Sequence, residues 1–139
     1  MRLVIWMSSS DSRRVDAHAA DSTILILSAD ALAAALLGAL LETLGYAVGF
    51  ARPEEGSEDA IRRVRPRVGL IDCDDGTTCT PELLGRAAMR GISIVIFGRR
   101  TTLDRVRPLA RDHEIELLLV PPDASTLDAA VRRALRRAG

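Results

Sequence analysis

Short apolar segments alternate along this chain with longer amphipathic or alanine-rich segments. The short segments are residues 23–27, 46–51, 68–72, 92–97 and 115–120, and the longer ones are 31–44, 53–64, 81–90, 103–112 and 125–137. The short segments are rich in Val, Ile and Leu and contain few polar residues, which is typical of strands buried on both faces of a parallel sheet. The longer segments have the length and residue types of helices.

Polar residues, glycine and proline mark the ends of these elements. Asp30 is a suitable N-cap for the helix at 31–44, and Gly45 stands where a helix typically ends. Pro66 separates the second helix from the next strand, and Pro81 suits the first turn of the third helix. The alternation predicts an α/β fold with three layers (α-β-α), in which helices cover both faces of a five-stranded parallel sheet. We expect the flavodoxin-like strand order 2-1-3-4-5.

Composition sets the broad class of the protein. A chain of 139 residues with 47% hydrophobic and 27% charged residues is usual for one globular domain. Its formal net charge is zero, so no bulk field attracts nucleic acid or a membrane, and Asp30 argues against a membrane span near residues 24–41. We expect a domain at 23–139 preceded by an arm and linker at 1–22. Because residues 1–22 lack a good signal peptide pattern, we expect a cytoplasmic protein.

The stretch RVGLIDCDDG, residues 67–76, contains the main candidate site. Asp72 ends a buried strand, and the carboxyl ends of parallel strands line the crevice in which such folds bind ligands. Asp74 and Asp75 follow, and together with Asp30 they are a candidate acidic cluster for Mg²⁺. The alternative is a metal-free polar loop, with Asp30 acting only as a helix cap.

The two cysteines, Cys73 and Cys79, lie on either side of this acidic stretch. Their C-x5-C spacing matches no common zinc motif, and His18 and His113 are far away in sequence. We therefore predict reduced cysteines with a structural role.

Two phrases indicate a family. GYAVGFARPEEGSEDAIRRVRPRVGLID, residues 45–72, has the spacing of a second strand, second helix and third strand that end in an acceptor aspartate. LLLVPPD, residues 117–123, has a proline and an aspartate before the last helix. From Ile24 onward the sequence resembles the receiver domains of bacterial two-component response regulators, in which similar phrases read RPDLVLLD and LLKPFD. The resemblance implies a CheY-like fold and a cis Val120–Pro121 bond.

Receiver domains accept a phosphoryl group on the aspartate that ends the third strand, and the resemblance places this role on Asp72. In the family, two acids after the first strand hold Mg²⁺, while a Thr or Ser after the fourth strand and a Lys after the fifth bind the phosphoryl oxygens. The matching positions here hold, in that order, Ser28, Ala29, Gly98 and Val120, with Leu117 where many receivers have an aromatic residue. The sequence contains no lysine at all.

We therefore interpret the chain as a degenerate, or pseudo-, receiver of two-component-type signal transduction. It would act through protein partners of a bacterial signalling pathway, with no cofactor and without the usual aspartyl phosphorylation. Two alternatives stay open: a true phospho-acceptor receiver that uses Asp72 with a divergent Mg²⁺ site, and an α/β regulatory domain that binds a small ligand in the vacated crevice.

The helix at 31–44 suggests an interface. Glu42 is its only charged residue after the Asp30 cap, and a helix that is apolar all round is usually buried. We expect it to be covered by a second copy of the chain, giving a homodimer, or by the Leu3–Met7 arm. The expected interface residues are Leu32, Ala35, Gly38, Ala39 and Trp6. The alternative is that alanine is simply a good helix former.

Other functional patterns are missing from the sequence. No nucleophile elbow, phosphate-binding loop or dinucleotide fingerprint occurs, so we do not expect an enzyme. Arginines gather at residues 99–111 and 132–137, with acidic residues nearby. Without a helix-turn-helix or an aromatic stacking platform, these arginines indicate solvated helix ends or protein docking rather than nucleic-acid binding.

Overall fold

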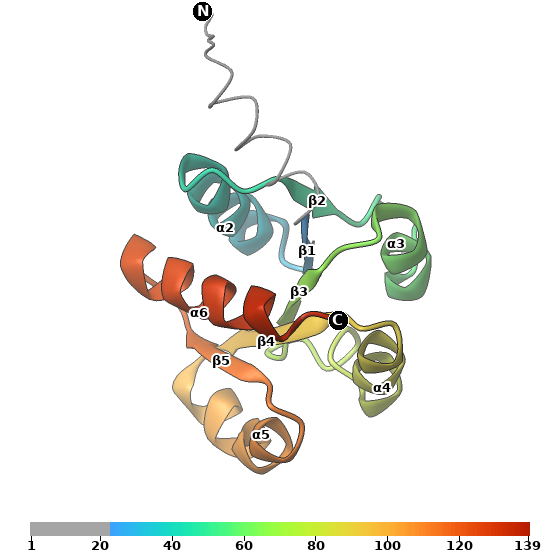
Figure 1. The fold of residues 1–139 in the computed structure, drawn as a ribbon, viewed down its shortest axis with the longest axis vertical. Helices are drawn as coiled ribbons and strands as arrows, with labels where there is room; N and C mark the ends of the chain where they lie inside the picture. The colour runs from blue at the N-terminus through green and yellow to red at the C-terminus, as the bar shows by residue number, and fades with distance from the viewer. Residues whose placement is uncertain (1–22) are drawn as a thin grey trace, which may run out of the picture.

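The computed structural model describes residues 23–139, in which five parallel strands alternate with five helices (Figure 1). The strands are β1 (Ile24–Leu27), β2 (Val48–Phe50), β3 (Val68–Asp72), β4 (Ser93–Gly98) and β5 (Glu116–Leu119). The helices are α2 (Ala31–Thr43), α3 (Ser57–Val64), α4 (Pro81–Met89), α5 (Arg100–Asp112) and α6 (Ala124–Arg137). The sheet order β2-β1-β3-β4-β5 confirms the predicted flavodoxin-like fold. The predicted arm, with Trp6, lies outside the described residues.

Two apolar layers hold the sheet between its helices. Helices α2 and α6 cover one face, and α3, α4 and α5 cover the other (Figure 1). Within β1, Ile24 and Ile26 pack on the first face, while Leu25 and Leu27 pack on the second. Both faces of β1, β3 and β4 are therefore buried from solvent, which explains their continuous apolar sequences.

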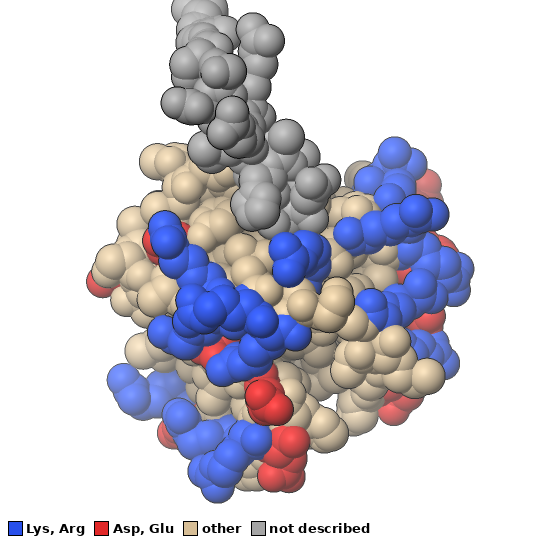
Figure 2. Space-filling model, viewed as in Figure 1, with Lys and Arg blue, Asp and Glu red and all other residues tan. Residues whose placement is uncertain are grey.

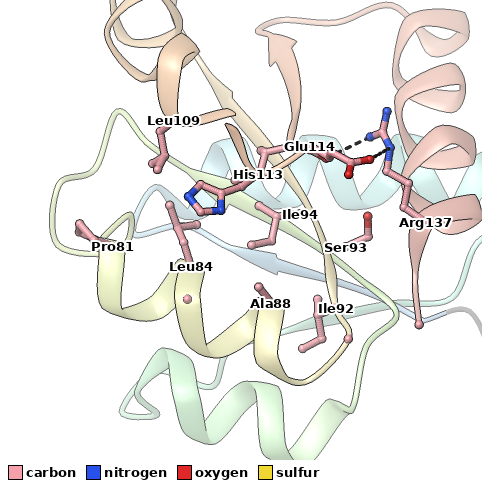
Figure 3. Close-up of a pocket in the computed structure, with 14 residues that line it drawn as sticks. Pro81, Leu84, Ala88, Ile92, Ser93, Ile94, Leu109, His113, Glu114 and Arg137 are labelled. Atoms are coloured by element: carbon pink, nitrogen blue, oxygen red, sulfur yellow. Dashed lines mark hydrogen bonds and ion pairs between the residues drawn. The ribbon is translucent and has the colours of Figure 1, made fainter. Parts of the chain in front are cut away.

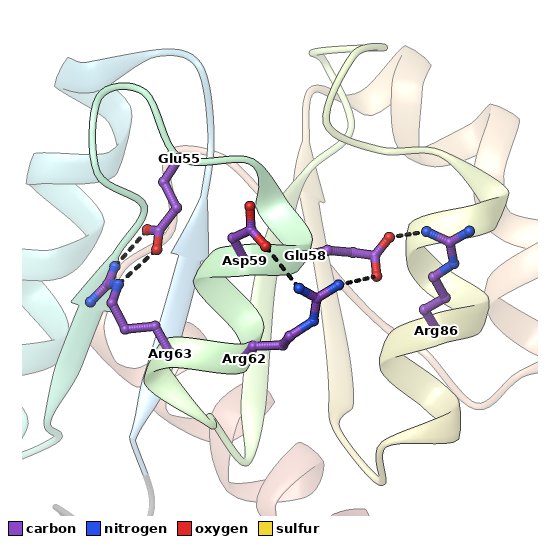
Figure 4. Close-up of polar contacts among 6 residues, drawn as sticks. All are labelled: Glu55, Glu58, Asp59, Arg62, Arg63 and Arg86. Carbon is purple, nitrogen blue, oxygen red and sulfur yellow. Dashed lines mark hydrogen bonds and ion pairs between the residues drawn. The ribbon is translucent and has the colours of Figure 1, made fainter.

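Helix α3 begins at Ser57 rather than at the predicted Pro53. Glu55 explains the difference, because its carboxylate accepts a hydrogen bond from the backbone N–H of Arg52 (3.0 Å) and pairs with Arg63 at 2.7 Å (Figure 4). These contacts stabilise a turn ahead of the helix. The hydrogen bond from Arg63, followed by that from Arg52, lowers the pKa of Glu55 to about 2.

The prediction of reduced cysteines is wrong. Cys73 and Cys79 form a disulfide in the β3–α4 loop, with their Cα atoms 4.9 Å apart. The loop turns tightly, since the N–H groups of Thr78 and Cys79 both donate to the carbonyl of Asp75. The C-x5-C spacing alone does not reveal a turn that brings the two thiols together.

Helix α2 is only partly covered within the described residues. Leu37, Gly38 and Leu41 are buried, whereas Leu32 and Leu36 are 69% and 63% exposed. Gly38 packs against β2, because a Cβ atom placed there would lie 2.5 Å from Cζ of Phe50. Gly38 therefore serves internal packing, and its assignment to an outward interface was wrong. Ala35 and Ala39, by contrast, are exposed.

Candidate functional site

Asp72 lies at the carboxyl edge of the sheet, where β3 neighbours both β1 and β4. Its carboxylate is 5% exposed and is bonded locally. Oδ2 accepts a hydrogen bond from the Ser28 hydroxyl at 2.6 Å, and Oδ1 accepts one from the backbone N–H of Asp74 at 2.9 Å. Ser28 follows β1 directly, so the two strand ends are joined through the predicted acceptor position.

Asp74, unlike Asp72, directs its side chain towards helix α5. Its carboxylate accepts the backbone N–H of Arg99 at 3.1 Å and the hydroxyl of Thr102 at 2.5 Å, and lies 3.5 Å from Arg99 Nε. Asp74 thus caps α5 from a separate loop. This contact explains why α5 begins at Arg100 and not at the predicted Leu103.

The electrostatics of Asp74 favour the charged form. Burial raises its pKa, but the hydrogen bonds from Thr102 and Arg99 outweigh burial, and the net shift is downward. Gly98 makes room for this arrangement, because a Cβ atom at that position would lie 3.0 Å from Asp74 Oδ1 and 3.3 Å from the Thr102 methyl. The position where the family resemblance requires a hydroxyl is therefore packed against a carboxylate.

Asp75 and Asp30 serve separate local structures. Asp75 accepts hydrogen bonds from the hydroxyls of Thr77 and Thr78, both at 2.6 Å, and these bonds lower its pKa. Asp30 accepts the N–H groups of the first turn of α2 at 3.0 and 3.1 Å, as predicted for an N-cap. Within residues 23–139, no group of three or more His, Cys, Asp or Glu side chains is arranged to hold a metal ion.

A cleft of about 760 Å³ lies between α2 and the β5–α6 loop. All four aspartates line it, together with Ala29, Val120 and Pro121 from the family-matched positions. The sequence therefore located half of the residues that line this cleft, whereas Ser28 and Gly98 lie outside its lining. The Val120–Pro121 peptide bond is cis, as the resemblance implied. Leu117, in contrast, packs in the core under α3–α5 and does not line the cleft.

Other residues of the site were not anticipated from the sequence. Leu36, Leu40 and Phe97 give the cleft an apolar wall, and Arg99 contributes its basic group. Thr102 lies in the first turn of α5 and is 4% exposed, and its hydroxyl donates a hydrogen bond to the Asp74 carboxylate. No motif marks Thr102, because its role depends on a contact with a residue 28 positions earlier.

A second groove, of about 450 Å³, lies between α4 and α5 near the start of β4 (Figure 3). Leu84, Ala88 and Leu109 line it, with His113 at its rim. None of the four aspartates of the first cleft takes part in it.

The arginines largely face carboxylates. Figure 2 shows blue side chains gathered over α6 and α3, with red ones among them. Glu116 of β5 binds Arg133 at 2.8 Å and Arg137 at 2.5 Å. Burial raises the pKa of Glu116, but the two guanidinium groups outweigh it and lower the value. On the other face, Glu58 links Arg62 to Arg86 (Figure 4).

Among residues 23–139, no helix is both long enough and apolar enough to cross a membrane.

Comparisons with known proteins agree on the fold. No protein-family model matches the sequence, and no curated protein is similar to it. Among solved structures, a response regulator receiver domain protein from Clostridium thermocellum superposes with a TM-score of 0.68 at 20% identity, covering 84% of this chain and 95% of that chain. The receiver domain of a modulated diguanylate cyclase from Desulfovibrio desulfuricans gives 0.62 at 27% identity, covering 84% and 94%.

A third structure, the signal receiver domain of a LuxO repressor protein from Vibrio parahaemolyticus, superposes with a TM-score of 0.67 at 20% identity and covers 84% of this chain and 92% of that chain. These likenesses confirm that the chain has the fold of response regulator receiver domains, the family that its sequence resembles.

Proposed function

We propose that this chain is a pseudo-receiver, a cytoplasmic signalling module that binds protein partners without aspartyl phosphorylation and without an enzymatic activity of its own. The observation that carries the proposal is the burial and hydrogen bonding of the Asp72 carboxylate. Asp72 is 5% exposed, and its two carboxylate oxygens accept hydrogen bonds from the Ser28 hydroxyl and from the backbone N–H of Asp74.

The charge around Asp72 also supports this proposal. Phosphoryl transfer depends on positive charge placed around the transferred group. Among the residues that line the cleft, Arg99 is the basic one, and its guanidinium already lies 3.5 Å from Asp74. The remaining charged groups are carboxylates, which repel an incoming phosphoryl group.

The Asp74 contact supports a fixed rather than switched state. In the family that the chain resembles, a hydroxyl after the fourth strand responds to the phosphoryl group. Here Gly98 stands at that position, and the Asp74 carboxylate already joins the β3–α4 loop to α5. We propose that this contact, rather than a phosphoryl group, sets the α5–β5–α6 surface for partner docking.

Mass spectrometry after incubation with acetyl phosphate and Mg²⁺ tests the proposal, with an active receiver domain treated in parallel. We expect no added phosphoryl group on this chain. A phosphoryl adduct that disappears in Asp72→Ala would establish the alternative, a phospho-acceptor receiver with a divergent Mg²⁺ site.

The cleft favours a second candidate function, the binding of a small ligand. It combines an apolar wall of Leu36, Leu40 and Phe97 with aspartates at one side. This lining suits a compound with an apolar body and a cationic group. Native mass spectrometry of the chain purified from its host would reveal such a ligand, and a mass equal to that of the bare chain would count against it.

We also propose that the exposed face of α2 mediates homodimerisation. Leu32, Leu36, Ala35 and Ala39 form an outward surface without a charged residue between Asp30 and Glu42. We expect light scattering to give a dimer mass for wild type and a monomer mass for Ala35→Glu. Ala88→Glu, on the exposed side of α4, is the matched control and should stay dimeric. A monomeric wild type would remove this proposal.

A further inference from the structure

The Cys73–Cys79 disulfide lies beside the candidate site and is not part of the receiver pattern that the sequence resembles. Cys73 directly follows Asp72 and is 2% exposed, within the core under α3 and α4. Cys79 is only partly buried and precedes Thr80, the N-cap of α4. The bridge therefore closes a short ring whose interior residues include Asp74 and Asp75.

We propose that this cysteine pair is a reversible redox modification site, and that its reduction by a dithiol releases Asp74 from the start of α5. The proposal does not depend on whether Asp72 accepts a phosphoryl group. Disulfides in the cytoplasm are uncommon, and those that occur are usually transient and redox-sensing. This step rests on the proposed cytoplasmic location: a bridge in a surface loop of such a domain fits that class better than a permanent cross-link does.

The difference in burial between the two sulfur atoms sets the direction of attack. A thiolate of the dithiol reaches Cys79 Sγ, forms a mixed disulfide and breaks the Sγ–Sγ bond. Cys73 leaves as a thiolate with the bonding electron pair and takes up a proton. The second thiol of the reductant then attacks the reductant's first sulfur, which is bonded to Cys79 Sγ in the mixed disulfide. Cys79 leaves as a thiolate and is protonated in turn. The protein gains two thiols, and the reductant becomes a cyclic disulfide.

The bridge restricts the loop that presents Asp74. Cys73 is anchored to β4, because its backbone N–H donates to the carbonyl of Phe97 at 3.0 Å. Cys79 ties the far end of the loop to the same point. With the bridge open, the loop between these residues gains conformational freedom, and the contact of Asp74 with the Arg99 N–H has to compete with that freedom. The oxidation state is thereby linked to the start of α5.

Hydrogen exchange and thiol alkylation of the full chain test the proposal. The chain is treated with dithiothreitol under native conditions. One portion is then denatured in iodoacetamide to count its thiols, and in the other the exchange of the Arg99 amide is followed by NMR. We expect two alkyl groups per chain after reduction and none before it. The Arg99 amide should exchange roughly tenfold faster in the reduced chain, as expected when a hydrogen bond to a charged group is weakened. Amides of β1 should not change.

The double variant Cys73→Ala/Cys79→Ala is the matched control. It should show the fast Arg99 exchange at all times and no response to dithiothreitol. Alkylation without reductant would show that no bridge forms. Resistance of the folded chain to the dithiol, or global unfolding on reduction judged by circular dichroism, would make the bridge a permanent cross-link. Unchanged Arg99 exchange after reduction would show that bridge and helix are not linked. Each of these results would overturn the proposal.

Discussion

Asp72 and Asp74 lie two residues apart at the end of the same strand, yet they play opposite structural roles. Asp72 is buried and bonded to its immediate surroundings, Ser28 and the loop backbone. The side chain of Asp74 is 26% exposed and reaches across to α5, where it binds Arg99 and Thr102. The residue that matches the family's acceptor is therefore locally enclosed, and Asp74 makes the contact that connects the sheet edge to the start of α5.

Under the proposed function, the comparison indicates how a switch position can become structural. A carboxylate of the chain itself, that of Asp74, binds the Arg99 N–H and the Thr102 hydroxyl at the start of α5. A contact of this kind needs no phosphoryl donor. The mutations below separate the two aspartates by the size of their effects.

Asp74→Ala should have the largest effect. It removes the cap of α5 and leaves the Thr102 hydroxyl, in a residue 4% exposed, without its acceptor. We expect a loss of about 2–3 kcal/mol in the free energy of unfolding. Urea denaturation measures this loss. A change as small as that of an exposed control, Asp104→Ala, would show that the anchor is not important for stability.

Gly98→Ala should have the second largest effect, a loss of about 1–2 kcal/mol in the free energy of unfolding. The added methyl carbon would meet Asp74 Oδ1 at 3.0 Å and must push the carboxylate or Thr102 aside. Gly85→Ala on α4 is the control, since nothing lies within 4 Å of a Cβ atom there. Equal or higher stability of Gly98→Ala would contradict the close packing of Asp74 against β4.

Asp72→Ala should cost less, about 1 kcal/mol. Ser28 loses its partner, but its hydroxyl also lies 3.4 Å from the carbonyl of Asp30 and can turn towards it. Urea denaturation again gives the value. A loss larger than that of Asp74→Ala would reverse the comparison between the two aspartates.

The smallest expected effect is a difference between wild type and Asp74→Asn in how stability falls at acidic pH. The folded-state pKa values of Asp74 and Asp75 are lowered, so their contribution to stability is complete above the unfolded value of about 4. This contribution is lost as the pH falls from about 4 through the folded pKa values. Unfolding midpoints between pH 2 and 6 should fall more steeply for wild type than for Asp74→Asn. Parallel curves would show that Asp74 is not preferentially charged in the folded state.

The sequence predicted the sheet and the neighbourhood of Asp72 because apolar runs and strand ends are local patterns. The order 2-1-3-4-5 already placed the end of β3 beside that of β4, but the contact between the loops that follow them was not predicted. The sequence did not reveal which aspartate turns towards α5. That choice depends on the space at Gly98 and on the hydroxyl of Thr102, which only the packed structure defines.

Two further errors have the same origin. The disulfide depends on a turn centred on Asp75, and C-x5-C spacing alone does not reveal that turn. Gly38 was assigned to an outer surface because α2 is apolar on every side, but the ring of Phe50 from β2 packs against it. Helical periodicity cannot distinguish a small residue that receives a neighbouring side chain from one that faces a partner.

The most direct test of the pseudo-receiver account is a titration with beryllofluoride, an analogue of the phosphoryl group, in the presence of Mg²⁺. The backbone amides of Asp74 and Arg99, which lie on either side of the Asp74 carboxylate, are followed by ¹H–¹⁵N NMR. We predict spectra that match those recorded with Mg²⁺ alone. Saturable shifts of both amides that are absent in Asp72→Ala would contradict the account and would make Asp72 a working acceptor.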